Sequence, residues 1–160
     1  MALNPKILEE ELLRQSEAAA NGQNITYGDF VSAMEKYALG IQYPPPTGVV
    51  PAAALLKKLL DTIPTQPPLP IATPIIKLAV SLFALSIGFA APIGTGLIFP
   101  TIPPSGQPAI DSILAQPNSR EQVASQLANA IHTYMITGTY DAFGIPAGSN
   151  PAVPGYSPWT

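Results

Sequence analysis

A long apolar stretch near the middle of the chain, TPIIKLAVSLFALSIGFAA at 73–91, limits what this sequence can fold into. Thr73 is a suitable N-cap, and Pro74 suits the first helical position, where its missing N–H would be unpaired in any case. Pro92 prevents continuation. These signals predict a helix over 74–91. Because a single lysine is the only charge in it, the helix is apolar on every face and has to be covered by protein or by lipid.

The length of this helix leaves two interpretations open. About 18 residues span roughly 27 Å, slightly less than the ~30 Å hydrocarbon core of a bilayer. The helix is therefore either the buried centre of a bundle or a single membrane span with Lys77 near one end. The rest of the chain favours the bundle, because it contains capped amphipathic helices and no Lys/Arg-rich flank that would orient a span. A single-span membrane protein is retained as the alternative.

Five other segments carry the start signals of helices. Asn4 before Pro5 is an N-cap with proline at the first position, and Ser119 with Gln122 forms a capping box. The remaining starts are at Thr26, Pro51 and Pro108. Apolar residues follow at helical spacing, most clearly at Phe30, Met34, Tyr37 and Ile41. The sequence predicts an all-α fold, a small bundle of five to six helices around a buried apolar helix, with proline-rich loops.

Proline-rich segments separate these helices and follow the last one. Residues 43–48 and 64–70 are predicted to be stiff, extended spacers. Residues 139–160 hold four prolines, three glycines and four aromatic residues, more aromatics than a free tail usually carries. We therefore predict a helical domain over 1–138 and an extended C-terminal arm over 139–160. The arm either docks on a neighbouring subunit by its aromatic residues, which we favour, or folds back on its own subunit.

Low charge predicts an oligomer. Only 11% of residues are charged and the net charge is -3, so the surface resists association poorly. The seven Lys and Arg residues are spread thinly, which argues against nucleic-acid contact. The predicted contact residues are large apolar or aromatic side chains outside the helices: Tyr43, Phe99, Ile102, Tyr140, Phe143, Tyr156 and Trp159.

No residue pattern predicts chemistry. His132 is the only histidine and there is no cysteine, so His132 is interpreted as structural rather than as a metal ligand or base. The glutamates at 9, 10, 11 and 17 are interpreted as a solvated acidic face, and Lys57 and Lys58 as a solvated basic one. The glycines do not form a phosphate-binding pattern. We predict a non-enzymatic protein without catalytic, cofactor-binding or metal-binding residues.

Two stretches, NITYGDFVSAMEKYALGIQYPPPTGVV at 24–50 and QLANAIHTYMITGTY at 126–140, are amphipathic helices on either side of a middle region rich in proline and alanine. In this arrangement residues 1–140 resemble small virion structural proteins of tailed bacteriophages. The resemblance transfers no functional residue. It implies a non-enzymatic subunit of a ring in the neck, tail or baseplate of a virion, assembled in the host cytoplasm. Its implied partners are further copies of the chain and other virion structural proteins.

Overall fold

Six helices and three short strands are found in the part of the chain that this computed structural model describes, residues 3–23, 27–41, 46, 48–63, 69–87, 101–102, 104, 106–115, 119–141 and 156–158. The helices are α1 (Pro5–Ala20), α2 (Tyr27–Ala38), α3 (Val49–Leu60), α4 (Leu69–Ser86), α5 (Asp111–Ala115) and α6 (Arg120–Met135). The strands are β1 (Thr101–Ile102), β2 (Thr139–Asp141) and β3 (Tyr156–Pro158).

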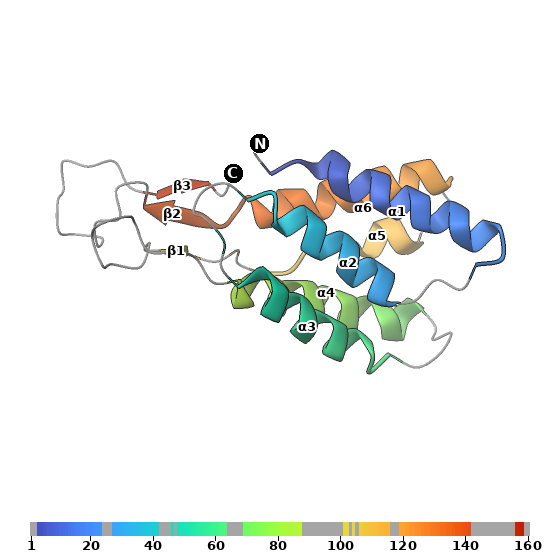
Figure 1. Cartoon of the computed structure of the whole chain (residues 1–160), viewed down its shortest axis with the longest axis horizontal. Helices are drawn as coiled ribbons and strands as arrows, with labels where there is room; N and C mark the ends of the chain where they lie inside the picture. The colour runs from blue at the N-terminus through green and yellow to red at the C-terminus, as the bar shows by residue number, and fades with distance from the viewer. Residues whose placement is uncertain are drawn as a thin grey trace.

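The helices pack side by side as a bundle (Figure 1). From α1 to α4 their directions alternate, and α6 runs antiparallel to α1. The most extensive contacts pair α1 with α6 and α3 with α4, while α2 lies between α1 and α3. The short helix α5 touches both α4 and α6, so the contacts run around a closed ring of helices. The predicted all-α bundle is confirmed.

The core lies inside this ring and takes large side chains from every long helix. The largest fully buried ones on these helices are Leu8, Met34, Tyr37, Leu56, Leu60, Val80, Phe83, Ile131 and Met135. On α2 the predicted apolar face is the one that points inward, because Met34 and Tyr37 are fully buried and Phe30 packs against the core. The helical spacing of apolar residues in the sequence therefore identified the buried side of α2 correctly.

The predicted caps on α1 and α6 are present. The Asn4 Oδ1 accepts a hydrogen bond from the Lys6 N–H at 3.0 Å, with Pro5 at the first helical position. The Ser119 Oγ accepts from the Gln122 N–H at 3.3 Å, and the Ser119 N–H donates to the Gln122 Oε1 at 3.1 Å. These bonds satisfy N–H groups that lack a partner within the helix, and they fix where both helices begin.

Helix α4 begins and ends earlier than predicted. It runs over Leu69–Ser86, so Thr73 is not its N-cap and Pro74 lies inside the helix. Thr73 is buried on the same helical face as Val80, seven residues later, so the packing of this segment in the bundle outweighs the local start signal. Residues 88–91, which were predicted to be helical, lie outside the described residues.

One side of α4 is buried and the other is exposed. Ala79, Val80 and Phe83 lie in the core, whereas Leu78 and Leu85 are 48% and 53% exposed. Within one chain, protein therefore covers one side of this helix and leaves apolar residues exposed on the other. Among the residues that the structure describes, none of the helices combines the length and the apolarity needed to cross a membrane.

A small antiparallel sheet with the strand order β1-β2-β3 extends from one end of the bundle (Figure 1). Thr101 pairs with Tyr140, and Asp141 pairs with Tyr156. The sequence did not predict this sheet. Strands of two or three residues are too short to produce a recognisable alternation of apolar and polar residues, and glycines and prolines surround them. Two pieces of the predicted arm are thus extended, and both are paired within the chain.

Candidate assembly interface

The structure brings three of the seven predicted contact residues to the small sheet. Ile102 lies in β1, Tyr140 in β2 and Tyr156 in β3. Ile102 is opposite Thr139 in the register, so three strands far apart in the sequence meet at this end of the molecule. The other four predicted contact residues lie outside the described part of the chain: Tyr43, Phe99, Phe143 and Trp159.

The outer edges of this sheet are formed by β1 and β3, because β2 pairs with both of them. An outer strand presents backbone N–H and C=O groups on the side that has no neighbouring strand. Figure 1 shows the sheet beside one end of the bundle rather than inside the ring of helices. The predicted contact positions at 102, 140 and 156 therefore lie in strands beside the end of the helical bundle.

A second group of apolar residues was not identified as a contact surface from the sequence. The large apolar side chains that are most exposed among the described residues are Leu39, Val50, Leu55, Leu78, Leu85 and Ile136. On α3, Leu55 is 36% exposed although its neighbour Leu56 is fully buried. The sequence did contain a signal for this surface. The apolar residues of α3 and α4 cover more of each helix than a single contact with the bundle can bury.

A buried polar contact joins α2 to α6. The Tyr37 hydroxyl lies 2.8 Å from the His132 Nδ1, and the two rings meet edge to face at a centroid distance of 6.1 Å. Burial raises the pKa of Tyr37 and lowers the pKa of His132, which favours the neutral form of both groups. In the tautomer with the ring proton on Nε2, the His132 Nδ1 accepts the bond and the Tyr37 hydroxyl donates it. His132, which was predicted to have a structural role, therefore makes a specific contact with a neighbouring helix.

Polar side chains also meet where α4, α5 and α6 come together. The Lys77 Nζ lies 2.7 Å from the Asp111 Oδ2, and hydrogen bonding to Lys77 is the main cause of the lowered pKa of Asp111. The Ser81 Oγ lies 2.8 Å from the Lys77 carbonyl oxygen and 3.2 Å from that of Gly106. The Tyr134 hydroxyl is buried without a hydrogen-bond partner among the described residues, and burial raises the pKa of Tyr134.

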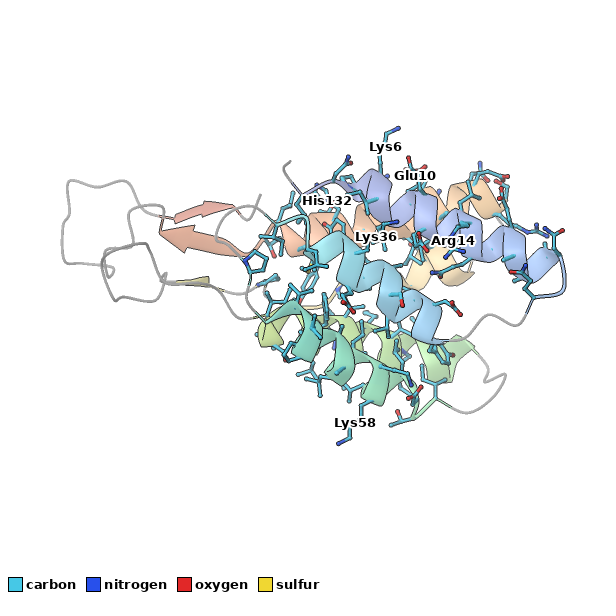
Figure 2. The ribbon with its side chains drawn as sticks, viewed as in Figure 1. Lys6, Glu10, Arg14, Lys36, Lys58 and His132 are labelled. Atoms are coloured by element: carbon cyan, nitrogen blue, oxygen red, sulfur yellow. The ribbon has the colours of Figure 1, made fainter. Side chains whose placement is uncertain are left out.

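The acidic face predicted on α1 is only partly solvated. Lys6 and Glu10 point away from the bundle at one edge, as Lys58 does at the opposite edge (Figure 2). Glu11 departs from the prediction, because its side chain is only 15% exposed and pairs with Arg14 and with the Lys36 Nζ at 3.4 Å. Hydrogen bonding to Arg14 is the main cause of the lowered pKa of Glu11. Glu11 therefore helps to join α1 to α2.

Metal binding is a further possibility for which the described residues can be searched. Within this part of the chain, groups of three or more His, Cys, Asp or Glu residues that could hold a metal ion are not found. Comparisons with protein-family models, with curated proteins and with solved structures find no match to the chain. Two features remain to be interpreted: the sheet at the end of the bundle and the exposed apolar side chains on the outward face of α4.

Proposed function

We propose that this protein is a non-enzymatic structural subunit of an oligomeric assembly, a neck, tail or baseplate component of a tailed-phage virion. It binds its neighbours through apolar surfaces outside its core. The virion assignment depends on the resemblance of residues 1–140 to such proteins. The proposal that it assembles has physical support in the structure.

The observation that carries the proposal is that three predicted contact residues come together on one small sheet. Ile102, Tyr140 and Tyr156 lie in three adjacent strands beside one end of the bundle. A sheet edge with nearby aromatic residues suits binding to another chain, since backbone hydrogen bonds and aromatic contacts can form together. The low charge of the chain, 11% of its residues, opposes such binding only weakly.

A truncation after Gly138 tests the proposal. All six described helices, and all the buried hydrophobic residues among those whose burial is described, precede that position, so the shortened chain is expected to keep its helical content. It is also expected to form a smaller assembly than the full chain, because β2 and β3 are removed. Native mass measurement and circular dichroism on both chains provide the two readouts.

A matched variant separates loss of the arm from loss of its aromatic side chains. The double substitution Tyr140→Ser and Tyr156→Ser keeps the backbone of β2 and β3 and removes two aromatic rings. We expect it to weaken the assembly in the same direction as the truncation. The proposal fails if the truncated chain has the same native mass and the same melting curve as the full chain, or if the full chain needs detergent and sediments with membranes.

A further inference from the structure

The outward face of α4 carries a regular apolar repeat. Ile75, Leu78, Leu82 and Leu85 follow one another at intervals of three, four and three residues. Leu78 and Leu85 are 48% and 53% exposed, and Ile75 and Leu82 are partly exposed. In the sequence of α4 the spacing continues four residues earlier at Ile71. This alternation of three and four is the heptad repeat with which one helix packs along another.

The polar residues of α4 near this stripe are already satisfied within the chain. The Lys77 ammonium pairs with Asp111 and is 21% exposed, and the Ser81 hydroxyl is bonded to backbone carbonyl groups. The Ser86 hydroxyl donates to the Leu82 carbonyl oxygen at 2.6 Å. Covering the stripe would therefore remove apolar side chains from water without leaving a charge or a hydroxyl group unpaired.

A second copy of α4 is the partner that this stripe fits. An apolar heptad seam packs against another apolar seam with the same spacing, because each side chain inserts between side chains of the facing helix. The other long helices described here present charged residues on their exposed sides, such as Glu10 on α1, Lys36 on α2, Lys58 on α3 and Glu121 on α6. Burying those charges against an uncharged stripe would be costly. A second α4 has no such charge.

We propose that two copies of the chain associate through α4 against α4, with the stripe Ile75, Leu78, Leu82 and Leu85 as the contact. This inference rests on the proposed function only for the expectation that the chain assembles. The stripe is about 15 Å long, shorter than the three to four heptads of a coiled coil that forms by itself. It can nevertheless pair because α4 is held as a helix by its contacts with α3 and the core.

The residues beside the stripe allow close approach of two helices. Pro74 and Ser86 flank it on the exposed surface, and Ala79 and Ser81 flank it on the buried sides of α4. Charged flanking residues would favour either a parallel or an antiparallel pair and would repel the wrong partner. Their absence from these four positions means that like charges do not face each other when α4 meets its own copy.

The double substitution Leu78→Glu and Leu85→Glu tests the contact. Both side chains are about half exposed, so the fold is expected to tolerate the change, with the same helical content as the unmodified chain. The dissociation constant of the dimer is expected to rise on the order of a hundredfold or more, since apolar contacts are lost on both copies. Leu39→Glu is the matched control, because Leu39 is 57% exposed and lies outside α4.

Sedimentation of the full chain and of both variants gives three distinguishable results. Dissociation of the Leu78→Glu, Leu85→Glu chain with an unchanged Leu39→Glu chain supports the α4 contact. Unchanged association of the α4 variant overturns this inference and leaves the proposed function in place. A full chain that is monomeric at high micromolar concentration overturns both.

Cross-linking provides a second readout that does not depend on weakening the contact. The chain has no cysteine, so each introduced thiol is unique. A parallel pair is expected to form a disulfide between two Leu78→Cys chains, and an antiparallel pair between a Leu78→Cys chain and a Leu82→Cys chain in a mixture. Lys58→Cys on the exposed side of α3 is the control and is expected to stay reduced. Absence of cross-linking in both α4 combinations would contradict the proposal.

Discussion

At the scale of single residues, the hydrogen bond between Tyr37 and His132 joins α2 to α6 through two residues that are 95 positions apart in the chain. Tyr37 is fully buried, so an unsatisfied hydroxyl there would be costly, and the His132 Nδ1 is the hydrogen-bond partner that avoids this cost. The residue types alone did not predict the pair. From the sequence alone, many residues are equally plausible partners for a lone histidine beside an apolar helix face. Tyr37 can be singled out only once the relative positions of α2 and α6 are known.

This contact predicts a pH dependence of stability. Burial lowers the folded-state pKa of His132 below its ordinary value of 6.5. The unfolded chain therefore takes up a proton at higher pH than the folded chain does. The stabilisation is complete above pH 6.5 and is lost as the pH falls through the lowered pKa of the folded state. Urea unfolding at about pH 7.5 and about pH 5 measures the difference.

Two substitutions separate the titration from the hydrogen bond. His132→Ala and Tyr37→Phe both remove the bond, and His132→Ala is expected to cost about 1–3 kcal/mol because it leaves the Tyr37 hydroxyl unpaired. Only His132→Ala is expected to make the free energy of unfolding nearly independent of pH between about pH 5 and about pH 7.5. The carboxylates of Glu11 and Asp111 have lowered pKa values, so they titrate below this pH range. Equal pH dependence in the His132→Ala chain and the unmodified chain would contradict the account.

At the scale of secondary-structure elements, α4 is where local sequence signals and tertiary packing disagree. Thr73 followed by Pro74 is a normal start signal, yet the helix starts at Leu69 and Pro74 is its sixth residue. Proline there cannot donate a hydrogen bond to the carbonyl oxygen one turn earlier. Burial of Thr73 and the contacts of α4 with α3 offset that loss. The chain thus retains a locally unfavourable residue on the exposed side of α4.

Replacing this proline is expected to stabilise the protein. Pro74→Ala restores a backbone donor within the helix and is expected to raise the free energy of unfolding by about 1–3 kcal/mol. Pro51→Ala is the matched control, because Pro51 is also exposed but lies in the first turn of α3, where proline is tolerated. Thermal or urea unfolding measures both variants. Destabilisation by Pro74→Ala would mean that Pro74 begins the helix after all.

The same comparison shows which elements a sequence can predict. Helices α1 and α6 have caps at Asn4 and Ser119 that depend only on neighbouring residues, and α2 has a single clear apolar face, so all three were predicted. The start of α4 depends on long-range packing. The strands pair residues as distant as 101 and 140, which no local pattern encodes. The contact role predicted for Ile102, Tyr140 and Tyr156 stays a prediction, and the sheet in which these residues lie was not predicted.

At the scale of the whole molecule, the two proposed contact surfaces lie on different parts of the fold. One is the outward side of α4, along the bundle, and the other is the sheet at the end of the bundle (Figure 1). A two-fold contact of α4 with its own copy closes at a dimer. Growth beyond a dimer therefore requires the second surface. The variants that remove one surface each are expected to give assemblies of different size.

The native mass of the full chain tests the central claim most directly. The claim is that this protein is a subunit that covers its exposed apolar surfaces with neighbouring subunits. One chain has a mass of 16.7 kDa. We predict a particle whose mass is a multiple of this value and which dissociates on dilution or after the Leu78→Glu, Leu85→Glu substitution. A single 16.7 kDa species that persists to high micromolar concentration would contradict the account.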